Sequence, residues 1–418
     1  MRFRMNKTVL LIATFDTKEA EARFLKGRIE ARGLRVLTMD TGILAPPQSQ
    51  VDIEQNQVAL RGGISLREAV ATGDKGKCIL NMLRGAEMIT RELYEQGKFH
   101  GVISIGGAQG TEIACAAMRK LPVGIPKLAV STVASGRATF GPFVGTKDIT
   151  LMHSVADMQG LNFLTKRILE NAAGAICGMM ENLEEELMRP EKIPVALSML
   201  GTTTPGALRC KGIMEGKGFE VVTFHQNGTG GIAMEDMIRE GAFKGVLDLN
   251  LHEIGDRFVG GLHSSLRDDR LEAAGEIGIP QVVAPGSINY VVLGPLASLP
   301  PEWRSRKLIV HNPSLTLVRL NSDELRGVGK QVAEKLNRAK GPTHLFIPLK
   351  GFSYPDRENH PHWDPEGNQA FVDSLKANLH PSIPLTELDA HINDPEFIDP
   401  VAEVFLSMMS GLMGAKHV

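Results

Sequence analysis

Residues 9–18 read VLLIATFDTK and residues 195–204 read VALSMLGTTT, and this pair of segments indicates the fold class. Each segment is an apolar run that leads through a polar loop and a helical stretch to a glycine turn, at Gly33 or Gly218, and then to a second apolar run. The two glycines lie 185 positions apart (218 − 33). The unit of strand, loop, helix, glycine turn and strand therefore occurs twice. At the same offset the two copies share Thr17 with Thr202, Val36 with Val221 and Thr38 with Thr223.

The two halves continue to correspond after these strands, although the offset between matching segments is no longer 185 positions. Residues 102–105 and 246–249 are apolar runs that follow a helical stretch, and residues 128–130 and 282–284 follow a Gly-Ile-Pro turn in each half. Short apolar strands that alternate with helical segments predict a parallel sheet covered by helices on both faces. We therefore expect an α/β protein with two similar domains, residues 1–190 and 191–418, and a ligand cleft between them.

Three further segments complete the predicted organisation. The acidic stretch 181–186 and the prolines after it indicate a connector near residue 190. The insertion 43–77 contains two prolines and a Gly-Gly pair, which favours a loop or small hairpin over the strand ends. Residues 345–349 form a candidate strand, and Asp394-Pro395-Glu396 predicts the start of a closing helix.

The composition excludes several classes of protein. With 43% hydrophobic and 22% charged residues over 418 positions, the chain is neither disordered nor embedded in a membrane. Its formal charge of −2 provides no basic field for nucleic acid or an anionic membrane, so the expected partner is a small anionic ligand. Four separated cysteines suit a reducing cytoplasm, and the apolar run 9–13 is too short for a signal peptide.

Loops that follow the predicted strands of the first half are rich in Gly, Ser and Thr. Ligands of open parallel sheets bind beyond the carboxyl ends of the strands. Small residues let backbone N–H groups approach a phosphate, and Lys18 adds charge. Asp16 and Thr17 can hold Mg²⁺, or Asp16 can simply cap a helix. The candidate ligand-binding residues are Asp16, Thr17, Lys18, Gly106, Gly107, Gln109, Gly110, Thr111, Ser131, Thr132, Ser135, Gly136, Gly145 and Thr146.

The second half offers its own candidates. Two glycine- and threonine-rich loops can form a second anion site, and titratable residues after residue 251 can supply acid, base or metal groups, although the match to a His-Glu-x-x-His zinc helix is poor. The histidine-containing loop 354–364 is expected to be a surface loop, with a metal or substrate loop as the alternative. The candidate anion residues are Gly201, Thr202, Thr203, Thr204, Gly228, Thr229, Gly230 and Gly231, and the catalytic candidates are His252, Glu253 and Asp256.

Several ordered motifs carry a resemblance that covers nearly the whole chain. They include Asp16-Thr17-Lys18, Ser131 to Gly136, Val144 to Ile149, Met152 to Asp157, Gly228 to Glu235, Arg270 to Gly275 and His391 to Pro395. Through them the chain resembles a largely uncharacterised family of bacterial and fungal proteins that share the ATP-binding inhibitory domain of the tomato mosaic virus resistance protein. Gln109 departs from the small residue common in that family.

The resemblance implies two Rossmann-like subdomains, ATP binding in the first one and self-association as a homodimer. Our leading hypothesis is therefore an ATP-binding protein, with Mg²⁺, whose phosphates lie on the loops at Asp16, Gly106 and Ser131. Two alternatives stay open: an enzyme that acts on a small carboxylate or sugar acid in the cleft, and a nucleotide-regulated interaction module.

Overall fold

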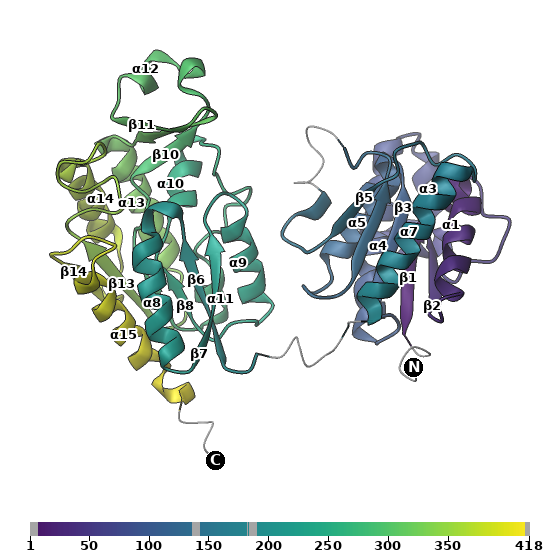
Figure 1. The fold of residues 1–418 in the computed structure, drawn as a ribbon, viewed down its shortest axis with the longest axis horizontal. Helices are drawn as coiled ribbons and strands as arrows, with labels where there is room; N and C mark the ends of the chain where they lie inside the picture. Colours follow the sequence, from purple (N-terminus) through teal and green to yellow (C-terminus); the bar gives the residue numbers. More distant parts are fainter. Residues whose placement is uncertain (1–6, 136–142, 182, 184–189, 414–418) are drawn as a thin grey trace. The chain divides into compact units, whose positions relative to one another are not determined.

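The computed structural model describes residues 7–135, 143–181, 183 and 190–413, and it divides the chain into two compact units, residues 1–189 and 190–418 (Figure 1). Each unit is built on a parallel sheet of Rossmann-like type, as the sequence predicts. Within the described residues, no helix has the length and apolarity needed to cross a membrane.

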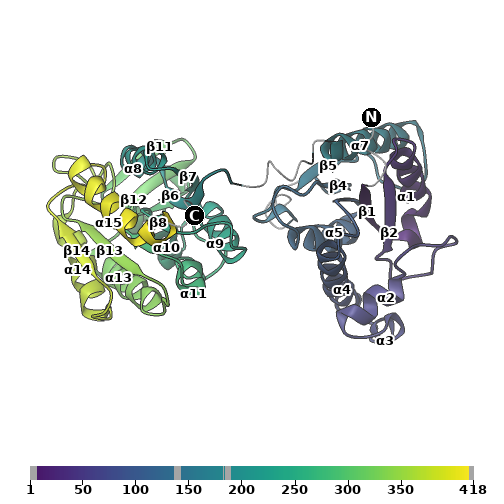
Figure 2. The same ribbon diagram turned by 90° about the horizontal axis from the view of Figure 1, so that it is seen from below.

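Unit 1 holds a five-stranded sheet in the order β2-β1-β3-β4-β5, and every neighbouring pair is parallel. Alternate residues of β1 enter opposite cores, because Val9 and Leu11 pack on one face while Leu10 and Ile12 pack on the other. Helices α1 and α7 cover the first face and α4 and α5 the second (Figure 2). The strands are β1 (Thr8–Ala13), β2 (Arg35–Asp40), β3 (Gly101–Gly106), β4 (Lys127–Ser131) and β5 (Thr150–His153), and the helices are α1 (Phe15–Glu30), α4 (Lys75–Glu95), α5 (Ala108–Arg119) and α7 (Phe163–Glu181).

Unit 2 repeats this strand order and extends it. Its parallel sheet runs β14-β13-β9-β8-β6-β7, so the first five strands of this sheet along the chain, β6, β7, β8, β9 and β13, are arranged as in unit 1. Gly33 and Gly218 precede the second strand of each unit with φ of 89° and 90°, a conformation that glycine adopts without strain. The strands are β6 (Ile193–Met199), β7 (Phe219–His225), β8 (Val246–Asp248), β9 (Gln281–Val283), β13 (Thr343–Pro348) and β14 (Leu385–Leu388), which confirms the predicted strands of both halves.

The helices of unit 2 also cover both faces of its sheet. Helices α8 and α15 pack on one face, whereas α9, α11, α13 and α14 pack on the other. The predicted closing helix is confirmed as α15. The bounds are α8 (Thr204–Gly216), α9 (Gly230–Arg239), α10 (His252–Val259), α11 (Ala273–Ile277), α12 (Pro301–Arg304), α13 (Ser322–Leu336), α14 (Pro365–Asn378) and α15 (Pro395–Met413).

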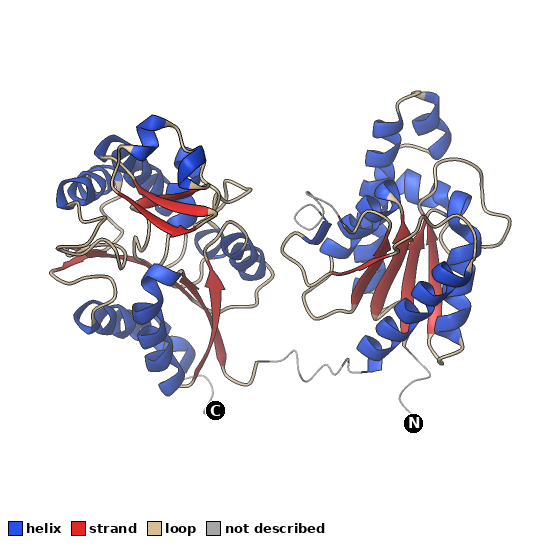
Figure 3. Ribbon diagram, turned by 45° about the horizontal axis from the view of Figure 1, so that its top comes forward, coloured by secondary structure: helices blue, strands red, loops and turns tan. Residues whose placement is uncertain are grey.

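Two parts of the fold differ from the sequence-based expectation. The insertion 43–77 is not a hairpin: it contains helices α2 (Gln55–Gly62) and α3 (Leu66–Ala71) and the start of α4, because capping boxes at Glu54 and Ser65 start the two short helices. Unit 2 also contains a separate antiparallel sheet that the sequence did not predict (Figure 3). Its strands are β10 (Tyr290–Leu293), β12 (Leu315–Arg319) and β11 (Leu308–Asn312), in that order.

Candidate functional site

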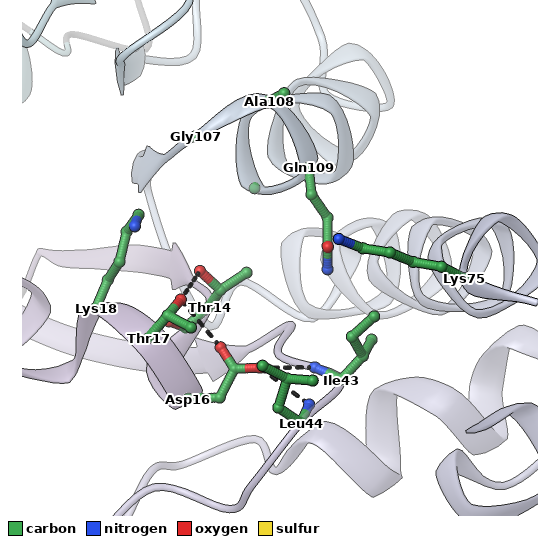
Figure 4. A pocket seen from close by; sticks show the side chains of 11 residues that line it. Thr14, Asp16, Thr17, Lys18, Ile43, Leu44, Lys75, Gly107, Ala108 and Gln109 are labelled. Atoms are coloured by element: carbon green, nitrogen blue, oxygen red, sulfur yellow. Dashed lines mark hydrogen bonds between the residues drawn. The ribbon is translucent and has the colours of Figure 1, made fainter. Parts of the chain in front are cut away.

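A pocket of about 340 Å³ lies at the carboxyl ends of β1 and β3 in unit 1 (Figure 4). The chain leaves these two adjacent strands toward opposite edges of the sheet, since β2 lies beyond β1 and β4 beyond β3. Such a topological switch point is where ligands bind in open α/β sheets. The lining residues are Thr14, Asp16, Thr17, Lys18, Ile43, Leu44, Lys75, Gly107, Ala108, Gln109 and Gly110.

One wall of the pocket is the segment that follows β2, and two carboxylates fix it. The Oδ2 of Asp16 accepts hydrogen bonds from the backbone N–H groups of Ile43 and Leu44, each at 3.0 Å. Asp40 accepts from the N–H groups of Phe15 at 3.0 Å and Gly42 at 2.8 Å. Burial raises the pKa of Asp40 to about 6. Asp16 therefore shapes the site by holding its wall, in addition to placing negative charge beside it.

The opposite wall is the start of α5, which presents backbone N–H groups. Gly107 is the N-cap residue and has no side chain that could accept from the first turn, whose N–H groups have no partner within the helix. Gly106 lets the end of β3 lie close to the first turn of α5, because a Cβ at that position would lie 2.8 Å from backbone atoms of Gly110 and Thr111. The start of α1 offers less, because the N–H of Phe15 donates to Asp40 and those of Thr17 and Lys18 donate to the carbonyl of Thr14. Two helix N-termini thus border one pocket, and the start of α5 is the one whose backbone favours an anion.

Two lysines add positive charge at this pocket. Lys18 lies at a break in α1, with φ −134° and ψ 28°, and its ammonium donates to the carbonyl of Met158 at 3.2 Å. Lys75 is the first residue of α4, and Figure 4 shows its side chain and that of Gln109 pointing toward one another. Among the described lining residues, Asp16 is the one carboxylate against these two cations. The electrostatics of the pocket therefore suit a negatively charged ligand.

The structure brings together only part of the predicted first-half site. Asp16, Thr17, Lys18, Gly107, Gln109 and Gly110 line the pocket. The hydroxyls of Thr111 and Ser131 are instead buried and bond each other at 2.7 Å, which ties α5 to β4. The hydroxyl of Ser135 lies 3.3 Å from a ring nitrogen of His153. Gly106, Thr132, Gly145 and Thr146 are also outside the lining, and Gly136 lies outside the described residues.

Sequence reasoning missed Lys75 and the wall formed by Ile43 and Leu44. All three residues belong to the insertion 43–77. The sequence predicts that this insertion lies over the strand ends, but it assigns no role to its residues. Asp74 is a residue type that caps helices, so the sequence could have placed Lys75 at the start of a helix, which is α4. The signal does not tell which pocket the helix start faces.

In unit 2, the glycine loop that begins α9 already holds an anion of the protein itself. The carboxylate of Glu253 accepts from the N–H groups of Gly228 at 2.8 Å and Gly231 at 3.1 Å. Thr229 and Gly230 belong to the same turn, so the proposed second anion site on this loop has an internal occupant. Burial raises the pKa of Glu253 above its usual value, and the guanidinium of Arg270 and the two N–H groups offset only part of that shift.

The other catalytic candidates are also enclosed. His252 and Asp256 have no exposed side-chain surface; a ring nitrogen of His252 lies 3.0 Å from the carbonyl oxygen of Ser287, and Asp256 accepts from the N–H groups of His263 and Val292, each at 2.6 Å. Burial lowers the pKa of His252 to about 3 and raises that of Asp256 to about 7. None of the three candidates lines the pocket of unit 1 or either of the two pockets described in unit 2. Their geometry supports a structural role.

The remaining second-half candidates divide between core and cavity. Thr203 and Thr204 bond the backbone of Leu200, whereas Gly201 and Thr202 line a second pocket. The loop 354–364 is not simply a surface loop: Asp356 and His362 are fully buried, because the Asp356 carboxylate accepts from the N–H of Phe352 and the amide of Asn368. Tyr354, Pro355, His360 and Pro361 from the same loop line the second pocket.

Comparison with known proteins identifies the family. Residues 7–185 match the N-terminal domain and residues 192–409 the C-terminal domain of the uncharacterised protein family UPF0261. A UPF0261 protein of Clostridium tetani is 42% identical, covering 97% of this chain and 100% of that protein. A UPF0261 protein of Mesorhizobium japonicum is 35% identical, covering 95% of this chain and 98% of that protein. The tomato ToMV resistance protein Tm-1(GCR237) is 35% identical over 96% of this chain, which spans 55% of the tomato protein. The chain therefore belongs to the UPF0261 family.

Proposed function

We propose that unit 1 binds ATP, with the phosphates in the pocket at the ends of β1 and β3. The observation that supports this most is the start of α5 at that pocket, because this helix begins at a glycine with no capping side chain and shares the pocket with Lys75 and Lys18. Backbone N–H groups at helix starts are general phosphate-binding groups. The resemblance to an ATP-binding domain points to the same ligand.

Each lining group has a role in this proposal. The N–H groups of residues 108–110 would donate to phosphate oxygens, and Lys75 and Lys18 would neutralise charge. Mg²⁺ would be held with the phosphates by Asp16 and Thr17, whose carboxylate Oδ1 and hydroxyl lie 3.2 Å apart and are oxygen ligands of the kind that Mg²⁺ prefers. The Oδ2 of Asp16 is occupied by the wall segment, so only one of its oxygens would serve the metal.

Isothermal titration of the full chain with ATP and Mg²⁺ tests the proposal. We expect Lys75→Gln to weaken binding by about tenfold, since an ion pair with a phosphate is lost. Lys77→Gln is the matched control, because Lys77 is on the same helix but does not line the pocket. Lys18→Ala should also weaken binding. No binding at millimolar ATP, or equal affinity for the Lys75 and Lys77 variants and wild type, would refute the proposal.

We further propose that the protein self-associates as a homodimer, which the family resemblance implies. Light scattering coupled to size-exclusion chromatography tests this directly against the 45.4 kDa of one chain. A mass of one chain across the accessible concentration range would contradict it.

A further inference from the structure

Unit 2 contains a second pocket, of about 590 Å³, at the carboxyl ends of β6 and β7. Its volume lies within the roughly 300–1,000 Å³ typical of small-molecule sites. Thr202 lines it at the position that corresponds, in the internal repeat, to Thr17 in the pocket of unit 1. The same strand-end position therefore borders a cavity in both units.

One wall of this pocket is a face of the antiparallel sheet. Val292, Leu317 and Ile309 are register partners across β10, β12 and β11, so they form one row on that face. The neighbours Val291 and Val318 point to the opposite face, where they pack in the core of the unit. A sheet with one face in a core usually has a polar second face toward water. Here the second face is apolar where it borders the cavity.

The facing wall is polar and comes from the ends of the parallel strands. Thr202 bonds the hydroxyl of Ser287 at 2.6 Å and that of Tyr290 at 2.9 Å, which fixes the wall beside the cavity. His225 ends β7, and His263 lies in the loop after α10. The Nδ1 of His263 is buried and has no hydrogen-bond partner among the described residues.

The third side is the loop after β13. Tyr354 is 62% exposed, and its ring packs edge to face on that of His360, with 5.4 Å between ring centroids. Both residues line the pocket, so an aromatic pair forms part of its border. The cavity is thus enclosed by a sheet face, strand ends and a loop, which favours a small molecule over a flat protein surface.

We propose that this pocket binds a small organic acid with an apolar, planar body, the body against the antiparallel sheet and the acidic group toward Thr202 and the histidines. Among its described lining residues there is no carboxylate, and its titratable side chains are four histidines and two tyrosines. Imidazole and hydroxyl groups can donate to a carboxylate, whereas no lining group would neutralise a cation. The described residues include no group of three His, Cys, Asp or Glu side chains placed to share a metal ion, so an organic ligand fits the histidines better.

The test uses the dye anilinonaphthalene sulfonate, an apolar planar anion, with the full chain. We expect one dye bound per chain, displacement by phenylacetate, and about tenfold weaker displacement by the neutral phenylacetamide. Gly201→Leu should reduce dye affinity by about tenfold or more, because a side chain at Gly201 starts in open space beside the pocket. Gly212→Leu, on α8 and also free of neighbours but outside the pocket, is the matched control. Leu315→Trp fills the cavity from the opposite wall and should act like Gly201→Leu.

Three results would overturn the proposal. The first is dye affinity that neither pocket-filling variant changes. The second is equal displacement by the acid and the amide, which would remove the preference for an acid. The third is a dimer that Gly201→Leu and Leu315→Trp both dissociate, which would mean that a second copy covers this face. Excess ATP should leave the affinity for the dye unchanged. The dye experiment therefore tests the pocket of unit 2 separately from the ATP site proposed for unit 1.

Discussion

Gly231→Ala tests whether Glu253 is the internal anion of the glycine loop in unit 2. A Cβ at this position would lie 1.8 Å from Oε2 of Glu253 and 2.7 Å from Nε of Arg270. The carboxylate would have to leave the loop, and the N–H groups of Gly228 and Gly231 would lose their acceptor. Hydrogen bonds to a charged group contribute about 1.5–3 kcal/mol each, so two of them amount to about 3–6 kcal/mol.

Alanine within a helix is more stable than glycine by about 0.5–1 kcal/mol, which offsets part of this loss. We therefore expect the free energy of unfolding of unit 2 to fall by about 2–5 kcal/mol. The chain has two tryptophans, Trp303 and Trp363, and both belong to unit 2, so their fluorescence during urea unfolding reports on this unit alone. With an m-value near 3 kcal/mol per molar urea, the midpoint should fall by about 1 M.

The control is Gly212→Ala, at an open helical position of the same unit, which should raise stability by about 0.5–1 kcal/mol. Glu253→Gln retains one acceptor oxygen and should give an intermediate loss. A midpoint for Gly231→Ala within about 0.2 M of wild type, where the m-value is about 3 kcal/mol per molar urea, would show that the loop does not depend on this carboxylate.

Three further predictions concern Asp256, the cysteines and Asp16. Burial raises the pKa of Asp256 from 3.8 to about 7, so the folded state holds a proton that the unfolded state releases between these pH values. The stability of wild type relative to Asp256→Asn should therefore fall as pH rises from about 4 to about 7. A constant difference between the urea midpoints of the two proteins would contradict this. All four cysteines are buried, so Ellman's reagent should label none of them before unfolding, and rapid labelling of one thiol would show an opening that the structure lacks. Asp16→Ala removes the acceptor for two N–H groups of the wall segment, so hydrogen exchange at residues 43–44 should become faster, and unchanged exchange would mean that the wall is held by other contacts.

Much of the fold was predictable because it depends on local patterns that occur twice. Short apolar runs, each followed by a turn and a helical stretch, indicate parallel strands without knowledge of the partners. The glycine turns at Gly33 and Gly218 need a left-handed backbone conformation, which the sequence signals directly. Ser65 followed by Glu68 is also a readable capping box, and it would have predicted a helix within the insertion.

The rest depends on contacts between distant residues. Glycine loops look alike in sequence, but the loop at Gly228 receives the carboxylate of Glu253 from α10, and nothing in the loop itself reveals this. The run Tyr290 to Leu293 is too short to distinguish a strand from a buried helix segment, and its partner β12 lies more than twenty residues away. Lys75 reaches the pocket of unit 1 only because the insertion folds into helices that place the start of α4 there.

Hydrogen exchange followed by mass spectrometry, with and without ATP and Mg²⁺, shows whether the pocket of unit 1 holds the nucleotide phosphates. We predict slower exchange in peptides that cover residues 14–18 and 107–111, which border the pocket, and no change over residues 226–231, where Glu253 already occupies the loop. Protection confined to unit 2, or none in unit 1 at saturating ATP, would contradict it.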